Sequence, residues 1–171
     1  MTEEEYYEKI YRLTYIIRYG NIPRIKDESV AEHTFLVSAM LLQLHEEYDF
    51  DLGKALVIST SHDVLEAETS DICHTLKRDN KELYDSIKKA EKSFAVHYPS
   101  AIKYGLEEYD RNDCLESWLV HLADAQQCLQ TSNNELKTGG NEYFNEVRDN
   151  SLFRIKCLRK ELEPYLIKNR G

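Results

Sequence analysis

The chain has 171 residues, of which 42% are hydrophobic and 31% charged, and its formal net charge is −9. This composition is typical of a globular domain and excludes a disordered chain. The sequence shows no basic face of the kind that binds nucleic acid polymers, and its longest apolar run, ALVIS, is too short to cross a membrane. Four scattered cysteines and an acidic first segment unlike a signal peptide predict a cytoplasmic protein with reduced thiols.

Helical spacing of apolar residues dominates the chain, and no alternating stretch predicts a sheet. The pattern predicts helices over about 2–18, 30–48, 51–68, 80–97, 100–109, 114–139 and 141–163, with a break at 69–76. Ser29 and Glu32 have the spacing of a capping box, which places the start of the second helix at Val30. Asp113, with Glu116 three residues later, is the expected N-cap of the long helix. We predict an all-α fold, a bundle of about six to eight helices in a single domain over residues 1–171.

His33 falls in the first turn of the second predicted helix, where a polar side chain can still reach a cleft. The residues that follow it, among them Phe35, Leu36 and Val37, supply a broad apolar face. Three interpretations remain open for this histidine: a surface residue, a hydrogen-bonded core residue and a metal ligand.

The sharpest local signal is TSHDVLEAETSD, in which His62 and Asp63 are adjacent near the end of an apolar helix. Neighbours on a helix point about 100° apart, so one metal can take both only if it lies between the two directions. Glu66 follows His62 by four residues, and we expect it on the same helix face. The alternative interpretation is a helix end with solvated charges.

Asp124 is embedded among apolar residues such as Leu122, Ala123 and Ala125. Because aspartate is rarely buried without a partner, a metal is a good candidate for that partner. Alternatively, Asp124 faces solvent on an amphipathic helix. His121 lies one turn earlier, where it either approaches the same site or only packs.

Arg18 closes the first predicted helix, and an arginine at a loop entrance can bind a phosphate through two parallel hydrogen bonds. It is equally an ordinary favourable cation at a helix C-terminus. Asp71 is either a helix cap or a contact to a substrate hydroxyl, and Lys77 is a second candidate for phosphate.

These residues occur in the order H…HD…D, which resembles the HD-domain metal phosphohydrolases. Two histidines and two aspartates suit one divalent ion, Mn²⁺, Co²⁺, Fe²⁺, Zn²⁺ or Mg²⁺, and do not choose among them. The segments IRYGNIPRIKDESVAEHT and HDVLEAETSD further resemble the small bacterial 5′-deoxynucleotidases of the YfbR type. Small phage dATP triphosphohydrolases are similar in the same segments, so the resemblance does not separate the two activities.

The resemblance implies a role for each candidate residue. The metal ligands it implies are His33, His62, Asp63 and Asp124. It implies Arg18 and Lys77 as phosphate contacts, Glu66 as acid or base, and Asp71 as the residue that places substrate or water. Tyr19 and His121, which stand where the family usually has tryptophan and often lysine, are assigned to substrate binding. Prolines of the family are replaced here by Gly20, Cys73 and Thr75.

The expected activity is hydrolysis of a deoxynucleoside 5′-monophosphate to deoxynucleoside and phosphate. The alternatives are a deoxynucleoside triphosphohydrolase, a nucleotide sensor without turnover, and a plain helical scaffold. Glu66 argues against a sensor, because a binder has no need of a poised carboxylate, and Asp124 argues against a scaffold. The resemblance also implies a homodimer or larger homo-oligomer in the cytoplasm, of the host if a phage encodes the chain.

Overall fold

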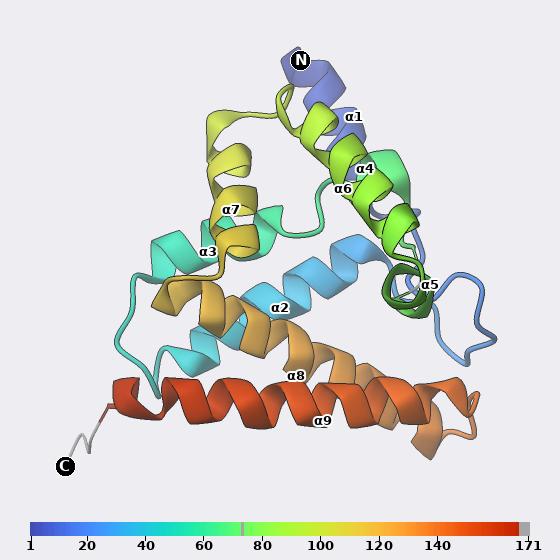
Figure 1. The fold of residues 1–171 in the computed structure, drawn as a ribbon, viewed down its shortest axis with the longest axis vertical. Coiled ribbons are helices and arrows are strands. Elements are labelled where there is room, and N and C mark those ends of the chain that lie inside the picture. The colour runs from blue at the N-terminus through green and yellow to red at the C-terminus, as the bar shows by residue number, and fades with distance from the viewer. Residues whose placement is uncertain (73, 168–171) are drawn as a thin grey trace.

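The computed structural model describes residues 1–72 and 74–167, without the side chains of His74 and Thr75. Cys73 and the Thr75 side chain, two of the predicted departures from the family, therefore lie outside the described part. The helices are α1 (Glu3–Arg12), α2 (Val30–Leu44), α3 (Leu52–Ser61), α4 (Glu66–Thr69), α5 (His74–Asp79), α6 (Lys81–Ala95), α7 (Ser100–Arg111), α8 (Leu115–Lys137), α9 (Tyr143–Leu162) and a 3₁₀ turn at Glu163–Tyr165 (Figure 1). No strand occurs within the described residues, which confirms the prediction of an all-α fold.

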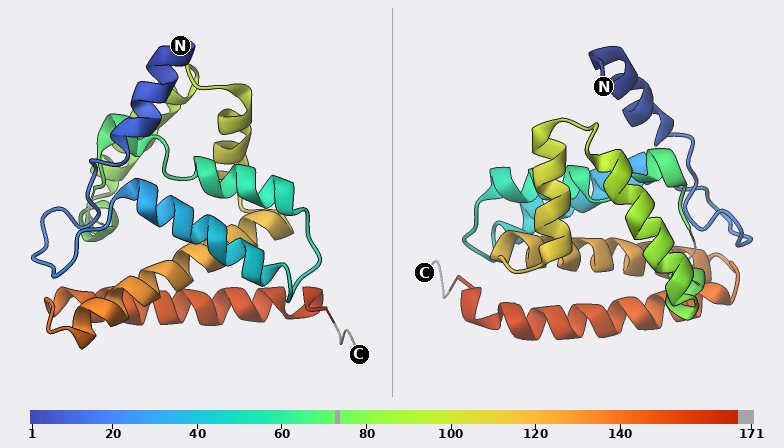
Figure 2. Two further views of the ribbon diagram at one scale, coloured as in Figure 1. Left: turned by 180° about the vertical axis from the view of Figure 1, so that it is seen from behind. Right: turned by 45° about the horizontal axis from the view of Figure 1, so that its top comes forward.

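The long helices α8 and α9 lie side by side and antiparallel, and α2 and α3 cover α8 (Figure 1). Helix α7 packs on α3, while α1 contacts α4. Residues 96–99 connect α6 to α7, and the two helices diverge from this connection, as Figure 2 shows from two further directions. The prediction of a single domain stays a prediction.

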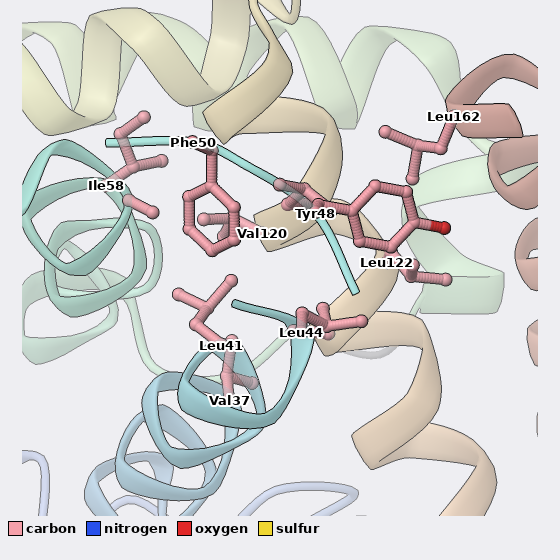
Figure 3. Packing of buried hydrophobic residues seen from close by; sticks show 12 residues of the cluster. Val37, Leu41, Leu44, Tyr48, Phe50, Ile58, Val120, Leu122 and Leu162 are labelled. Atoms are coloured by element: carbon pink, nitrogen blue, oxygen red, sulfur yellow. The ribbon is translucent and has the colours of Figure 1, made fainter. Parts of the chain in front are cut away.

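The main core lies where α2, α3, α8 and the end of α9 meet. Figure 3 shows Leu41 and Leu44 of α2 packed with Ile58 of α3, Val120 of α8 and Leu162 of α9. Truncating one such side chain to alanine typically costs about 2–5 kcal/mol of stability, so this region is held rigidly. Because α2, α3 and α8 also carry the candidate metal ligands, the core fixes the positions of those ligands.

Helix α2 begins as predicted. Ser29 caps it, its side chain accepts a hydrogen bond from the Glu32 backbone N–H, and the Glu32 carboxylate accepts one from Ser29 N. Asp51 similarly caps α3 by accepting from Lys54 N. Both caps satisfy backbone donors that a helix start leaves without partners.

The first helix is shorter than predicted, and Arg18 does not close it. Helix α1 ends at Arg12, and the chain then pairs with the segment before α2. Arg18 N–H donates to the Glu28 carbonyl at 2.9 Å, and an isolated bridge joins Ile17 and Ser29. These long-range backbone hydrogen bonds replace the helical ones, a tertiary preference that local propensity does not reveal.

Three further boundaries differ from the predictions. The expected helix over 51–68 is divided, since α3 ends at Ser61 and α4 begins at Glu66. Helix α5 occupies part of the expected break. Asp113 is not the N-cap of α8, because that position belongs to Cys114, without a side-chain cap, and the Asp113 carboxylate instead pairs with Arg111 at 2.9 Å.

Gly105 allows α7 to approach α3 closely. A Cβ atom at this position would collide with the Ser61 side chain and with the Val57 carbonyl oxygen. The backbone of α7 therefore lies directly against the last turn of α3, next to His62. This contact sets the register of Tyr109, one turn further along α7, whose ring lies 5.3 Å from the His62 ring.

A candidate metal centre between two cavities

The two histidines of the H…HD…D pattern meet at the centre of the fold. His33 lies in the first turn of α2 and is fully buried, and His62 is the C-cap residue of α3. Their Nε2 atoms are 3.3 Å apart. The sequence left three interpretations open for His33, and its burial beside His62 excludes a surface residue.

Hydrogen bonds on the far side of each ring fix which nitrogen faces the centre. His33 Nδ1 lies 2.7 Å from Gln127 Oε1, and His62 Nδ1 lies 2.6 Å from the Ser59 carbonyl oxygen. Because both partners only accept, each Nδ1 must donate, and each neutral ring then points the lone pair of Nε2 inward. The two rings are thus arranged as a pair of nitrogen donors, the arrangement that second-sphere hydrogen bonds impose on metal-binding histidines.

Two carboxylates complete the cluster. Asp63 Oδ2 lies 3.4 Å from His33 Nε2 and 3.2 Å from His62 Nε2, while Asp124 Oδ1 lies 3.5 Å from His33 Nε2. Burial opposes ionisation of Asp124, but Arg154, whose Nη2 donates to Asp124 Oδ2 at 2.9 Å, outweighs burial and holds the pKa of Asp124 well below its usual range. Asp124 is therefore a buried carboxylate with a partner, not a solvent-facing one.

The donor set fits a divalent cation. One group of ligand atoms, from His33, His62 and Asp124, lies within 4.8 Å of one another, and Asp63 approaches both rings. Ligand atoms about 2.0–2.2 Å from a metal are themselves about 3–3.5 Å apart. The distances between the two Nε2 atoms, from Asp63 to each of them, and from Asp124 to His33 have this spacing. Lone pairs and carboxylates facing one another in a buried site repel unless a cation joins them.

The pKa values of the two histidines also indicate that the cluster binds positive charge. Burial and the nearby Arg18 lower the pKa of His33 to about 4. Burial acts in the same direction on His62, but Asp63 beside it outweighs burial and raises the pKa of His62 to about 9. One proton thus occupies the cluster at neutral pH when no metal does, and a metal would displace that proton.

Glu66 lies beside this centre with an unpartnered oxygen. Its Oε2 is buried and has no hydrogen-bond partner among the described residues. Burial and the negative charges of Asp63 and Asp71 raise the pKa of Glu66 well above its usual range. The expectation that Glu66 and His62 share one helix face is wrong, because the chain turns between α3 and α4.

Two cavities open from the centre. The first, which we call the Arg18 cavity, has a volume of about 380 Å³ and a lining that includes Arg18, Tyr19, Asp71, Asp124, Cys128, Tyr143 and Arg154. The second, the α6–α7 cavity, has a volume of about 480 Å³ and is lined by α6 and α7. The two share the wall formed by Asp63, Glu66, Lys77 and Tyr109. A group bound at these four residues would therefore border both cavities.

The Arg18 guanidinium, which lines the Arg18 cavity, already has hydrogen-bond partners within the protein. Its Nη1 donates to Glu28 Oε1 at 2.7 Å and to Gln127 Oε1 at 3.1 Å, and its Nη2 lies 3.5 Å from Cys128 Sγ. The same Gln127 amide orients His33 and donates to Glu28 Oε2 at 2.8 Å. One hydrogen-bonded network therefore connects the arginine to a candidate metal ligand.

Tyr19 and Asp71 are held together at the edge of the Arg18 cavity. Tyr19 has a φ of 55°, an unfavourable backbone conformation for a bulky residue, and its N–H donates to Asp71 Oδ2 at 2.7 Å. The Tyr19 ring packs edge-on against Phe144. Strained backbone of this kind is common at functional sites, where surrounding contacts maintain it.

His121 does not join the other predicted residues. Its ring stacks on Tyr109 with centroids 4.0 Å apart, and its Nε2 donates to the Tyr109 carbonyl at 3.2 Å. Neither cavity is lined by His121. It packs behind a cavity wall, the second of the two interpretations that the sequence left open.

Several residues at the site were not among the sequence candidates. They are Glu28, Tyr109, Gln127, Tyr143 and Arg154. Gln127 carried a usable signal, since it is a polar residue three positions after Asp124 in the same apolar stretch. Arg154 carried none, because arginines are ordinary on an amphipathic helix such as α9.

Comparisons with known proteins agree with this geometry. A family model described as "5′-deoxynucleotidase YfbR-like" matches residues 5–168. A conserved hypothetical protein from Pyrococcus furiosus is similar in structure, with a TM-score of 0.78, 26% identity, and coverage of 95% of this chain and 94% of that chain. A Pyrococcus horikoshii protein has a TM-score of 0.79 and 24% identity, with 94% of each chain covered.

An HD-domain phosphohydrolase from Listeria innocua has the same fold, with a TM-score of 0.74, 21% identity, and coverage of 96% of this chain and 89% of that chain. No curated protein sequence matches the chain. Among the described residues, no helix is long and apolar enough to cross a membrane.

Proposed function

Because the chain belongs to the YfbR-like 5′-deoxynucleotidase family and is a metal-dependent phosphohydrolase, we propose that it hydrolyses deoxynucleoside 5′-monophosphates. The observation that supports this most directly is that Arg18, Glu66 and the two aspartates of the His–Asp cluster line one cavity of about 380 Å³. The homo-oligomer and the cytoplasmic location that the family resemblance implied stay predictions.

We propose His33, His62, Asp63 and Asp124 as ligands of one divalent ion. Their two nitrogen and two carboxylate donors suit several first-row metals and magnesium equally. When bound, such an ion supplies Lewis-acid polarisation of a phosphoryl oxygen and lowers the pKa of a coordinated water.

The chain's own residues bind the phosphate and manage the proton. Arg18 and Lys77 offset charge on the phosphoryl oxygens, and Arg154 adds a guanidinium at the same cavity while it orients Asp124. A water oxygen joins phosphorus as the bond from phosphorus to the 5′-oxygen breaks. Glu66, kept protonated by its surroundings, donates its proton to the 5′-oxygen, and the proton that the attacking water gives up then returns to the Glu66 carboxylate.

The charges around the Arg18 cavity favour a monophosphate over a triphosphate. Arg18 is already paired with Glu28, and Arg154 with Asp124, which leaves Lys77 as the cation without an ion pair among the described residues lining this cavity. A triphosphate held within the Arg18 cavity alone would bring more negative charge than this set can offset. Triphosphate hydrolysis therefore remains the second candidate, and a sensor without turnover would leave the buried Glu66 Oε2, which has no hydrogen-bond partner among the described residues, without a function.

Gln127→Leu is expected to weaken metal binding by about 10–100-fold, because the substitution removes the acceptor that orients His33. A competition titration against a chromogenic chelator measures this. Gln130→Leu is the matched control, since Gln130 is exposed on the same helix. Equal metal affinities for the two variants would contradict a role of Gln127 in orienting a ligand.

A product assay tests the proposed activity. The protein is incubated with each dNMP, NMP and dNTP in Mn²⁺, Co²⁺ or Mg²⁺, with Asp63→Ala as the blank, and products are separated by ion exchange. We expect deoxynucleoside and inorganic phosphate from dNMPs. Release of intact triphosphate from dNTPs would instead establish the second candidate, and no metal-dependent product from any substrate would contradict both.

A further inference from the structure

The α6–α7 cavity is larger than the Arg18 cavity, yet the proposed reaction uses only the wall they share. Its lining includes four lysines, Lys77, Lys88, Lys92 and Lys103. Lys88 forms ion pairs with Glu91 at 3.1 Å and Asp110 at 3.2 Å. Within the described part of the chain, Lys92 and Lys103 form no ion pair.

Five acidic residues also line this cavity, but among the described residues none of them forms an ion pair with Lys92 or Lys103. Asp63, one of the five, faces His33 and His62. Glu91 and Asp110 are engaged by Lys88, and Glu107 is exposed at the rim. Apolar side chains that include Ile87 and Leu106 form much of the remaining lining. Ammonium groups beside apolar walls attract an anion more strongly than the same groups do in open water.

The position of the cavity relates these lysines to the reaction. Tyr19 and Tyr143 lie on the Arg18 side of the shared wall, where a nucleoside would find aromatic surfaces. Lys92 and Lys103 line the α6–α7 cavity and not the Arg18 cavity, and the two cavities meet at Glu66, Lys77 and Tyr109. A phosphorus atom at the shared wall would thus have the nucleoside on one side and the lysines on the other.

We propose that the α6–α7 cavity is a subsite for phosphate groups beyond the scissile bond. The shared chemistry is a phosphate oxyanion bound by lysines, and it has two possible sources. One is the inorganic phosphate released by the reaction, and the other is the distal phosphates of a nucleotide with a longer chain. The proposal builds on the proposed function, since it assigns the nucleoside to the Arg18 cavity.

The test compares two doubly substituted proteins with the same net charge. Lys92→Gln/Lys103→Gln removes the two uncommitted lysines of the cavity. Lys81→Gln/Lys89→Gln is the matched control, because those lysines lie on α6 around a separate surface hollow. Inorganic phosphate is titrated into each protein by calorimetry, with and without metal, and the inhibition of dNMP hydrolysis by phosphate and by the deoxynucleoside is measured separately.

We expect phosphate binding and phosphate inhibition to weaken about tenfold in Lys92→Gln/Lys103→Gln, as the loss of two charged contacts implies. Inhibition by the deoxynucleoside and the control protein should be unchanged. Equal effects in the control would overturn the proposal, because they would report general charge and not this cavity. A change in deoxynucleoside inhibition alone would also overturn it, since the nucleoside would then occupy the lysine side.

A second arm distinguishes the two sources. If the substitutions raise the KM for dNTPs and leave that for dNMPs unchanged, the cavity holds distal phosphates of the substrate. If only phosphate inhibition changes, the cavity holds the released product. The calorimetric titration needs no turnover, so a protein that hydrolyses no nucleotide but loses phosphate affinity on substitution would contradict the proposed function and support the subsite.

Discussion

Asp63→Ala is expected to abolish stoichiometric metal binding and to lower turnover by about 10³-fold or more. Asp63 is the carboxylate that approaches both histidines, at 3.4 and 3.2 Å, so its removal leaves the two Nε2 atoms without their shared acidic neighbour. A bound metal typically contributes several kcal/mol of transition-state stabilisation, and each 1.36 kcal/mol corresponds to tenfold in rate. Metal content by plasma mass spectrometry and initial rates on dNMPs measure the two effects.

The metal-free proteins provide a second readout of the same substitution. Among the groups that raise the pKa of His62 to about 9, Asp63 contributes most, so in Asp63→Ala the His62 proton should be lost at a lower pH, which an NMR titration detects. Asp49→Ala, at an exposed loop position, is the control. Full metal occupancy in Asp63→Ala, with circular dichroism unchanged, would contradict its assignment as a ligand.

Glu66→Gln should lower kcat by about 10²–10⁴-fold while metal content and folding stay unchanged. The amide keeps the size of the carboxyl group, but it cannot give up a proton. Because Glu66 is held protonated by burial and by Asp63 and Asp71, its donor form is present below its raised pKa and is lost as the pH rises through that pKa. The wild-type rate should therefore decline at high pH, and the variant should lack this decline.

Glu68→Gln is the matched control, because Glu68 lies on the same short helix but pairs with Lys9, away from both main cavities. An unchanged kcat in Glu66→Gln would show that another group supplies the proton. Loss of metal in Glu66→Gln would show instead that Glu66 acts through the metal centre.

The start of α2 shows which parts of this protein the sequence makes predictable. Ser29 and Glu32 form a local cap, which needs no information from the rest of the chain, and so the position of His33 in the first turn followed correctly. The acidic partner of His62 was equally accessible, because Asp63 is its neighbour in sequence. Asp124 was a candidate because aspartate is rarely buried without a partner, although the sequence left solvent exposure open as the alternative.

Features that depend on distant segments were not predictable in the same way. Arg18 was placed at a helix end, but pairing with the segment before α2 moves it into a loop. The turn between α3 and α4, which places Glu66 beside the metal centre, contains no glycine or proline from which it could have been predicted. Arg154 reaches Asp124 from a helix thirty residues later in the chain, a contact that only the packing of α8 against α9 creates.

The close contact at Gly105 means that the α7 wall of the α6–α7 cavity is held more firmly than the α6 wall. Helix α7 is attached to α3 through its backbone and buries Ile102, Gly105 and Glu108, whereas α6 buries Ile87 alone among its described residues. Local opening of α6 therefore costs less free energy than opening of α7. The α7 wall of the cavity is therefore firmly held and keeps Tyr109 in register with the reaction centre. The α6 wall is the one that can shift to fit the size of a bound group.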